Sequence, residues 1–289
     1  MQIVFCCQSM IDICASSMIN FSGGISMDDY RTFAMTIARE AGGLLKKKIN
    51  DFHMISFKGE INIVTEADRM SEDMILSAIR DRFPHHDILS EESSATETGS
   101  AFRWIVDPLD GTTNYAHGYP VFCVSIALER EGDVLLGVVY NPMLNEMFVA
   151  EKQRGAYLNG HKLSVSGISV LSHSLLATGF PYDIREDKNN NINYFTEMAR
   201  KVQAIRRAGS AALDLAYVAA GRFDGFWELK LMSWDTAAGC LMIREAGGVV
   251  TDLFGAPFHL TSPHVLASNG ALHQDMMAVF RGLNPVPKM

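Results

Sequence analysis

Two segments near the start of the chain place apolar residues at the spacing of an α-helix. The first begins at Met27 (MDDYRTFAMTIAREAGGLLKKK), and its apolar face comprises Tyr30, Phe33, Ile37, Ala41 and Leu44. Acidic residues open this run and lysines close it, which complements the dipole of a helix. The second is TEADRMSEDMILSAIRDRF, where the inward positions are Met70, Met74, Ile75 and Ile79. The pattern predicts two amphipathic helices, with a short β-like stretch at 53–64 between them.

The middle of the chain changes to short apolar runs divided by turn residues, a pattern typical of β-strands. The runs lie at 102–107, 121–129, 134–142 and 146–152. EREGDV at 129–134 has the composition of a hairpin turn. We therefore expect an antiparallel sheet in this part of the chain.

The second half of the chain mixes helical and β-like segments around a polar loop at 183–193. Helices are predicted near 194–203, 210–221 and 235–246, and short strands near 174–178, 204–206, 223–228 and 264–267. Because no repeat, heptad or long linker divides the two halves, we expect them to share an interface.

The composition supports a folded domain and limits its partners. Of 289 residues, 48% are apolar, which is enough for a large core. A formal charge of −8 argues against direct nucleic-acid binding, because contact with phosphate backbones needs clustered Lys and Arg. An acidic protein still binds phosphate groups if metal ions supply the positive charge.

The first 26 residues are interpreted as an extension ahead of the domain, disordered or arising from an upstream start. Residues 3–25 are fairly apolar, but Asp12 interrupts them and no Lys or Arg precedes them, unlike a signal peptide or a membrane helix. The five cysteines follow no disulfide or metal-binding spacing. We therefore expect a cytoplasmic protein that does not associate with membranes.

The most informative segment is WIVDPLDGTTNYAHGYP, where an apolar strand leads into two aspartates. The carboxylates of Asp107 and Asp110 project from the same turn. Pro108 fixes the backbone direction, and Gly111 allows a ligand to approach the main chain. Hard cations such as magnesium take carboxylate oxygens as ligands. The same residues also suit an ordinary turn, so this motif alone does not decide between a turn and a metal site.

Two further acidic motifs favour the metal site. SEES at 90–93 places Glu91 just after an apolar segment, and SWDTAAG at 233–239 places Asp235 at the start of a helix. Taken separately, Glu91 suits a solvated surface charge and Asp235 an acid at a helix N-terminus. Together with the two aspartates of DPLDG, they form a set of acids spread along the chain.

The motifs NIVTEADR, SEES, DPLDGTTNY and WDTAAGCLMIREAGG, in this order, closely resemble the inositol monophosphatase family of metal-dependent, lithium-sensitive phosphatases. The resemblance runs from about Met27 to about Arg281. RRAGSAALDLAYVAAGRFDGFWE at 206–228 further resembles the bacterial SuhB-type branch. The resemblance implies an α/β (α+β) fold, a layered α/β/α/β/α sandwich of the type shared with fructose-1,6-bisphosphatase, assembled as a homodimer.

The resemblance also implies a metal site and a reaction. Magnesium, two or three ions in each active site, would be held by Glu91, Asp107, the carbonyl of Leu109, Asp110 and Asp235. Thr112 and Asp68 would orient the attacking water, with Glu91 assisting, in the hydrolysis of inositol monophosphate to myo-inositol and phosphate. Since two metal ions stabilise both the attacking and the leaving oxygen, we expect direct in-line attack by metal-activated water.

Substrate contacts are implied mainly in the second half. Glu228 is the expected acceptor for substrate hydroxyls, because carboxylates are strong acceptors. The other implied contacts are Glu91, Leu109, Asp110, Gly111, Thr112, Arg206, Gly209, Ser210, Ala211 and Asp235. Arg206 equally suits a surface or interface ion pair, and Lys58 suits either the site or solvent. SEES replaces the commoner Gly-Glu-Glu, so Ser90 leaves the shape of this loop in doubt.

These assignments divide residues 27–289, a single phosphatase domain, into a metal-binding half (27–165) and a substrate-binding half (166–289). The metal motifs do not separate inositol monophosphate from the substrates of fructose-1,6-bisphosphatase, 3′-phosphoadenosine 5′-phosphate phosphatase or histidinol-phosphate phosphatase. Glu228 and the short 183–193 region favour the inositol-like ester. An alternative hypothesis is a binding role: the bacterial relatives imply an RNA polymerase or antitermination partner, for which the basic surface would comprise Lys201, Arg206 and Arg207.

Overall fold

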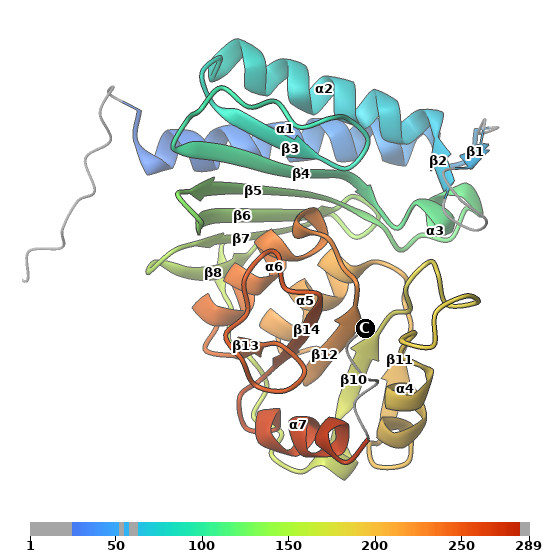
Figure 1. Cartoon of the computed structure of the whole chain (residues 1–289). Helices are drawn as coiled ribbons and strands as arrows, with labels where there is room; N and C mark the ends of the chain where they lie inside the picture. The colour runs from blue at the N-terminus through green and yellow to red at the C-terminus, as the bar shows by residue number, and fades with distance from the viewer. Residues whose placement is uncertain (1–24, 52–54, 58–62, 284–289) are drawn as a thin grey trace, which may run out of the picture.

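The computed structural model describes residues 25–51, 55–57 and 63–283. Five layers alternate in it: two helices, a sheet, two helices, a second sheet and two further helices (Figure 1). Three clusters of buried apolar side chains hold these layers together. The predicted α/β/α/β/α sandwich is confirmed, and the interpretation of residues 1–26 lies almost wholly outside the described residues.

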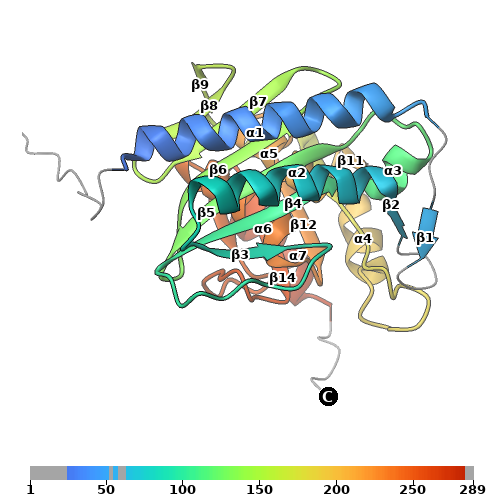
Figure 2. The same ribbon diagram turned by 90° about the horizontal axis from the view of Figure 1, so that it is seen from above.

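The first layer consists of the two predicted amphipathic helices, α1 (Met27–Lys48) and α2 (Glu66–Arg82). They run side by side over one face of the first sheet (Figure 2). A hairpin of β1 (Ile55–Phe57) and β2 (Ile63–Thr65) precedes α2, within the predicted β-like stretch. Both helices begin with a capping box, which satisfies backbone N–H groups that a helix start leaves unpaired; the pairs are Ser26 with Asp29 and Thr65 with Asp68.

The first sheet contains seven strands that lie in chain order. They are β3 (Asp87–Ser90), β4 (Phe102–Asp110), β5 (Cys123–Arg130), β6 (Asp133–Asn141), β7 (Glu146–Glu151), β8 (Gly155–Leu158) and β9 (His161–Lys162). Every pair is antiparallel except β3 with β4. The predicted hairpin turn joins β5 to β6 through Glu131 and Gly132, whose positive φ angles of 51° and 91° suit the twist of the flanking strands.

Strand β4 runs further than the sequence predicted. We expected it to end at Asp107, but it continues to Asp110, with a break in its pairing register against β5 between these two aspartates. Leu109, which is buried, continues the apolar run, and Pro108 has no N–H to donate to a regular ladder. The acidic motif is therefore an irregular strand end, followed directly by the short helix α3 (Thr112–Ala116).

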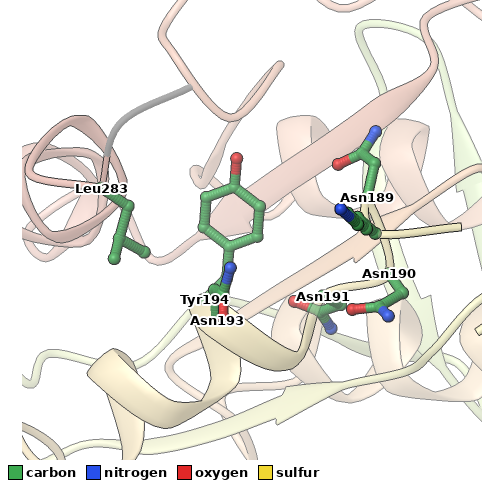
Figure 3. A pocket seen from close by; sticks show the side chains of 7 residues that line it. Asn189, Asn190, Asn191, Asn193, Tyr194 and Leu283 are labelled. Carbon is green, nitrogen blue, oxygen red and sulfur yellow. The ribbon is translucent and has the colours of Figure 1, made fainter. Parts of the chain in front are cut away.

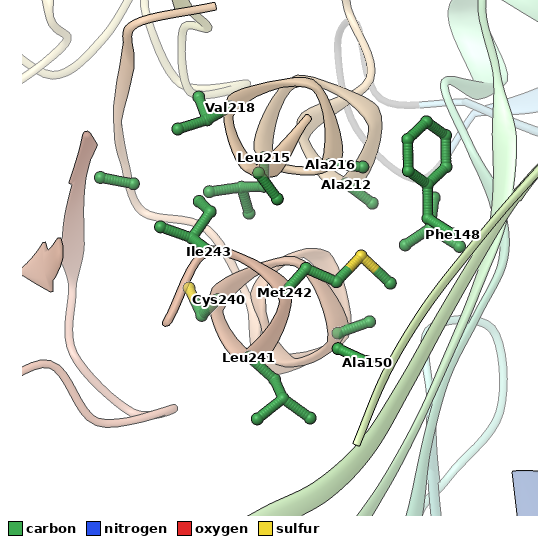
Figure 4. Close-up of a cluster of buried hydrophobic side chains, with 14 of the residues drawn as sticks. Phe148, Ala150, Ala212, Leu215, Ala216, Val218, Cys240, Leu241, Met242 and Ile243 are labelled. Carbon is green, nitrogen blue, oxygen red and sulfur yellow. The ribbon is translucent and has the colours of Figure 1, made fainter. Parts of the chain in front are cut away.

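The central layer consists of α5 (Ala211–Ala219) and α6 (Ser233–Glu245), which confirm two predicted helices. Both lie between the two sheets, and Figure 4 shows Ala212, Ala216 and Met242 on the side of Phe148 and Ala150 of β7. Small residues let the helices approach closely: a Cβ added to Gly239 of α6 would lie 2.5 Å from the Cβ of Leu215 in α5. This packing brings the start of α6 against the first sheet, where it contacts β4 and β5.

The second sheet and its outer helices complete the fold. The strands, in sheet order, are β11 (Ala204–Arg206), β10 (Leu175–Thr178), β12 (Gly225–Leu229), β14 (His264–Ser268) and β13 (Val249–Thr251). Helices α4 (Ile192–Ala199) and α7 (His273–Arg281) cover the far face. Among the helices of the described part of the chain, none has the length and apolarity that a bilayer crossing demands.

The sequence prediction was incomplete in both halves of the chain. The helix expected near 194–203 ends at Ala199, because the chain turns there to enter β11. Helix α7, strands β3, β8, β9 and β13, and the 3-10 turn at Leu171–His173 were not predicted. These elements are short, and α7 has no side-chain cap at its start, so no capping signal marks it in the sequence.

Candidate active site

Three aspartates from distant parts of the sequence converge where the first sheet meets α6. Asp107 and Asp110 lie at the irregular end of β4, and Asp235 lies in the first turn of α6. One carboxylate oxygen from each lies within 4.8 Å of the others. The register break in β4 allows both of its aspartates to join the cluster, and the packing of α6 on the sheet adds the third.

Hydrogen bonds orient these carboxylates. The backbone N–H of Leu109 donates to Oδ1 of Asp107 over 3.0 Å, and the backbone N–H of Met232 donates to Oδ2 of Asp235 over 2.6 Å. Asp110 accepts through Oδ2 from the Ser210 hydroxyl at 2.6 Å and from the N–H of Ala212 at 2.7 Å. A carboxylate that is held through one oxygen presents the other to a ligand.

The charges of the cluster are unfavourable without a cation. Burial, and then the neighbouring charges of Glu91, Asp110 and Asp235, raise the pKa of Asp107 well above its usual range. Burial and the same kind of repulsion also raise the pKa of Asp235. Since like charges in a buried site strongly oppose ionisation, a divalent cation would compensate them. The donor set consists of oxygens, which fits a hard cation.

Glu91, which follows β3, stands at the edge of this cluster. Its side chain is partly buried, and its negative charge acts on both Asp107 and Asp235. The three-aspartate group defined by mutual distance does not include it. The structure therefore brings Glu91 near the site while leaving Asp107, Asp110 and Asp235 as its compact centre.

The loop that carries Glu91 is held by Glu72, a residue that the sequence analysis missed. Glu72 is buried in α2 and accepts hydrogen bonds from the Ser90 hydroxyl and, over 2.6 Å, from the Ser93 hydroxyl. The N–H of Glu92 donates to the same carboxylate over 3.2 Å. Ser90, which stands where the family more commonly has glycine, thus helps to hold the loop through its bond to Glu72. The signal in the sequence was an acid on the inward face of a helix, four residues after Asp68.

Asp68 and Thr112 form a buried pair beside the cluster. The Thr112 hydroxyl lies 2.7 Å from Oδ1 of Asp68 and 3.1 Å from the carbonyl oxygen of Leu109. Oδ2 of Asp68 accepts from the N–H and the hydroxyl of Thr65 at 2.9 and 2.5 Å, within the cap of α2. Burial raises the pKa of Asp68, and these hydrogen bonds oppose that rise. The helix cap therefore fixes the acid that holds Thr112.

Two glycines fold the neighbouring backbone into a tight wall. Gly111 has a φ of +102°, and a Cβ there would lie 2.9 Å from the carbonyl oxygen of Val121 and 3.3 Å from that of Gly209. Gly209 has a φ of +88°. The Asn114 side chain donates to the carbonyl oxygens of Val121 and Ala208 over 2.7 and 2.8 Å. These contacts join the DPLDGTT segment to the one that begins α5, including Ser210 and Ala211.

Glu228 approaches the site from the second sheet. It is buried on β12, and burial raises its pKa to about 8, while Arg207 lowers it and Asp110 raises it further. Gly179 leaves space for its carboxyl group, because a Cβ at that position would lie 2.1 Å from Oε1. The pocket beside the aspartates thus contains a carboxyl group whose charge is sensitive to its surroundings.

Comparison with known proteins decides the family. The model of the inositol monophosphatase family matches residues 26–283 of the chain. The chain belongs to the inositol monophosphatase family. It is 44% identical over 84% of its length to the Nus factor SuhB of Pseudomonas aeruginosa, and 43% identical over 83% to the inositol-1-monophosphatase of Mesorhizobium japonicum. These matches cover 92% and 91% of the relatives, respectively.

Solved structures of inositol monophosphatases share the fold. The structure of inositol monophosphatase from Anabaena (Nostoc) sp. PCC 7120 superposes with a TM-score of 0.82 at 41% identity, covering 90% of this chain and 98% of that one. This chain is accordingly a phosphatase, and the family is one of metal-dependent enzymes, in agreement with the three-aspartate cluster.

Arg206 and Lys58 are the two basic residues expected near the inositol monophosphatase site, and the sequence left a surface position open for both. Arg206 is exposed and donates to the carbonyl oxygen of Ile205 over 3.2 Å, with no described contact to the acidic cluster. The charge of the next residue, Arg207, lowers the pKa of Glu228. Nη1 of Arg207 would lie 2.9 Å from a Cβ on Gly209. Arg206 ends β11 and Arg207 follows it directly, so sequence alone did not separate these arginines. Lys58 lies outside the described residues.

Replacing Glu228 by glutamine is expected to remove a pH dependence from the stability of this inositol monophosphatase without metal. A folded-state pKa of about 8, raised from 4.5, means that the stabilising contribution is complete below pH 4.5 and is lost as the pH rises through 8. The wild-type free energy of unfolding should therefore fall by at most about 5 kcal/mol relative to the variant between pH 5 and pH 9. Urea unfolding in EDTA measures this difference. A control variant at the exposed Glu40 of α1, Glu40→Gln, should show the same pH dependence as the wild type. Parallel wild-type and Glu228→Gln profiles would contradict a raised pKa for Glu228.

Proposed function

We propose that this phosphatase hydrolyses inositol monophosphate to myo-inositol and phosphate, with magnesium as its metal. The observation that carries the proposal is the convergence of Asp107, Asp110 and Asp235, with Glu228 buried in the adjoining pocket. The first three supply a site for cations that bind the phosphate group. Glu228 supplies a group for the hydroxyls of a polyol.

Magnesium would be held by Glu91, Asp107, the carbonyl oxygen of Leu109, Asp110 and Asp235, and two or three ions would share these ligands. Bound magnesium supplies positive charge at the attacking and leaving oxygens and lowers the pKa of water. The Leu109 carbonyl lies 3.1 Å from the Thr112 hydroxyl, so the expected carbonyl ligand is adjacent to the Asp68–Thr112 pair.

Thr112 and Asp68 would orient the attacking water. The Thr112 hydroxyl donates a hydrogen bond to Asp68, so the lone pairs of the Thr112 oxygen are available to accept a hydrogen bond from a water molecule. The pair is buried and fixed through Thr65, so it loses little freedom when substrate binds. Water then attacks phosphorus in line with the ester oxygen, and the alcohol leaves without a phosphoenzyme.

The alcohol of the substrate would lie between Glu228 and the segment at Gly209, Ser210 and Ala211. Glu228 accepts hydrogen bonds from ring hydroxyls, and Arg207 favours its ionised form. Gly111 and Thr112 contact the phosphate group. In place of Arg206, we assign Arg207 to this pocket, because its charge lowers the pKa of Glu228 and its guanidinium lies beside Gly209.

Phosphate release from a panel of substrates tests this proposal. The panel comprises inositol 1-phosphate, fructose 1,6-bisphosphate, 3′-phosphoadenosine 5′-phosphate and histidinol phosphate. We expect kcat/KM for inositol 1-phosphate to exceed the others by about tenfold or more, which corresponds to about 1.4 kcal/mol of selective binding in the transition state. EDTA should abolish release and excess magnesium should restore it.

Other outcomes of this panel would redirect the assignment. A preference for fructose 1,6-bisphosphate would favour a broader sugar-phosphate phosphatase, and activity that survives complete chelation would contradict the metal site. The lithium sensitivity that the family resemblance implies is measured in the same assay.

A second candidate function is that of an antitermination partner. Relatives in Pseudomonas aeruginosa and Escherichia coli that are 44% and 43% identical are named Nus factor SuhB. The basic residues Lys201, Arg206 and Arg207 are exposed on this chain. A pulldown with an Asp107→Asn variant separates the roles: retention of RNA polymerase without turnover would support binding, and failure to retain it would weaken this candidate.

The same framework includes three organisational proposals. We place the enzyme in the cytoplasm and propose that it forms a homodimer. We also propose a division into a metal-binding half at 27–165 and a substrate-binding half at 166–289. Asp235 belongs to the second half but contributes to the metal cluster. Size-exclusion chromatography with light scattering measures the oligomeric state.

A further inference from the structure

Lys230 occupies a backbone conformation that favours glycine. Its φ is +62°, in the left-handed region, where a side chain costs conformational energy that glycine avoids. It lies in the connection between Glu228 on β12 and Asp235 on α6, and its N–H donates to the carbonyl oxygen of Pro263 over 2.6 Å. A lysine at this position is therefore retained against a local cost, between a pocket residue and a residue of the metal cluster.

The side chain of Lys230 binds two acids on a distant segment. Its ammonium group lies 2.7 Å from Oδ2 of Asp183 and 2.5 Å from Oδ2 of Asp187. Partial burial lowers the pKa of Lys230, but the hydrogen bonds to these acids outweigh it, so its pKa is raised. Because the Lys230 ammonium group binds both Asp183 and Asp187, it links the 183–187 loop to the β12–α6 connection.

The ends of this loop are fixed by asparagines. The buried side chain of Asn191 donates to the carbonyl oxygen of Gly179 over 2.5 Å and accepts from Nε1 of Trp227 over 2.7 Å. Asn190 donates to the carbonyl oxygen of Ile184 over 3.0 Å. Figure 3 shows these asparagines beside Tyr194 at a small pocket that Leu283 also lines. The loop therefore has a rigid base, and Lys230 ties its outer part.

The inner edge of the same loop faces the active site. Gly179 is packed against the carboxyl group of Glu228. Three residues later, the phenol of Tyr182 lies where the charges of Glu91, Asp107, Asp110 and Asp235 raise its pKa, after burial as the first cause. The residue is nevertheless 55% exposed, so its ring is accessible from solvent, and it directly precedes Asp183, which Lys230 binds. Residues 179–187 are called the Tyr182 segment below.

We propose that Lys230 is a positioning residue for substrate selection, which holds the Tyr182 segment against the active site so that the Tyr182 hydroxyl bonds to a hydroxyl of the polyol. The proposal rests on the proposed function, because it assumes a hydroxyl-bearing substrate. It adds a second polar contact to Glu228 on the alcohol side of the pocket. Lys230 itself touches neither the substrate nor the cations.

Substitution of Lys230 by glycine tests the clamp, since it removes the ammonium group and relieves the left-handed strain. We expect KM for inositol 1-phosphate to rise about tenfold, the value of one hydrogen bond, while kcat stays within about twofold. KM for p-nitrophenyl phosphate, whose leaving group has no hydroxyl, should not change. An unchanged KM for inositol 1-phosphate, or an equal rise for both esters, would overturn the proposal.

Matched variants separate the clamp from general effects. Lys230→Arg keeps the cation and should keep KM within about threefold of wild type. Glu131→Gly relieves the same kind of left-handed strain in the distant β5–β6 turn and should leave both KM values unchanged. Tyr182→Phe should raise KM for inositol 1-phosphate as Lys230→Gly does, and the double variant should show no further rise. Additive effects of the two substitutions would contradict a shared mechanism.

Amide hydrogen exchange provides a readout that does not depend on activity. In metal-free protein without substrate, Lys230→Gly should speed exchange in residues 182–187 by about tenfold, because the loop opens more often. Glu131→Gly should not change it, and unchanged exchange in Lys230→Gly would overturn the clamp. Failure of the wild type to hydrolyse inositol 1-phosphate would instead remove the proposed function, and exchange alone would then decide whether Lys230 holds the segment.

Discussion

Substitution of Asp107 by asparagine is expected to reduce kcat by at least about a thousandfold, roughly 4 kcal/mol of transition-state stabilisation. The side chain is 1% exposed and lies in the three-aspartate cluster, so the variant loses a charged ligand at the centre of the site. Asparagine has nearly the same shape, and its amide oxygen still accepts from the N–H of Leu109. The loss should therefore come from charge, measured as phosphate release at saturating magnesium.

The same variant should be at least as stable as the wild type when no metal is bound. Burial and three neighbouring acids raise the pKa of Asp107, so its ionised form is unfavourable in the folded protein. The melting temperature of the wild type should rise when magnesium is added, and this rise should be smaller in the variant.

Asp224→Asn provides the matched control for Asp107→Asn. Asp224 is also buried, but it accepts from the N–H of Leu175 over 2.7 Å and from the Ser166 hydroxyl over 2.5 Å, in the second sheet. We expect Asp224→Asn to lower stability by about 1–2 kcal/mol and to leave kcat nearly intact. If Asp107→Asn kept more than about a tenth of wild-type kcat, Asp107 would not be a central metal ligand.

Replacing Thr112 by valine is expected to reduce kcat about a hundredfold, with a smaller rise in KM from its contact with the phosphate group and little change in the magnesium concentration needed. Valine preserves the shape of the side chain but removes the hydroxyl that lies 2.7 Å from Asp68. The attacking water would lose its orientation, an effect of about 2.7 kcal/mol on the barrier. Steady-state kinetics at several magnesium concentrations measure all three quantities.

Two variants distinguish water orientation from simple loss of structure. Thr112→Ser restores the hydroxyl and should recover most of kcat. Thr65→Val removes the other hydroxyl that bonds to Asp68, and should cost about 1 kcal/mol of stability through the cap of α2. Its kcat should fall much less than that of Thr112→Val. Equal losses of kcat in Thr65→Val and Thr112→Val would indicate that Asp68 only needs support.

Much of the fold was predictable because local patterns agree with it. The apolar period of 27–48 and the capping signals at Ser26 and Thr65 specify two helices before any packing is considered. The alternating runs of 121–152 likewise specify a meander of strands. Helix α7 escaped prediction because no capping residue marks its start, although its apolar residues follow a helical period.

The candidate site divides in the same way. The acidic motifs and the family resemblance were evident from sequence, and the resemblance implied the pairing of Asp68 with Thr112. The roles of Glu72 and Arg207 were not, because each depends on which neighbour its side chain meets after folding. Lys230 gave no sequence signal, since neither its left-handed backbone nor its two acidic partners can be inferred from adjacent residues.

Sequence by itself determined the helices and strands with strong periodicity, the acidic residues available for a cation and the family to which the chain belongs. Only the tertiary structure decided which of those acids meet, because Asp110 and Asp235 are brought together by a strand irregularity and by the packing of α6 between two sheets. Local propensity acts over a few residues, whereas a ligand cluster depends on distances between segments far apart in the chain. Those distances are fixed by side-chain packing across the layers.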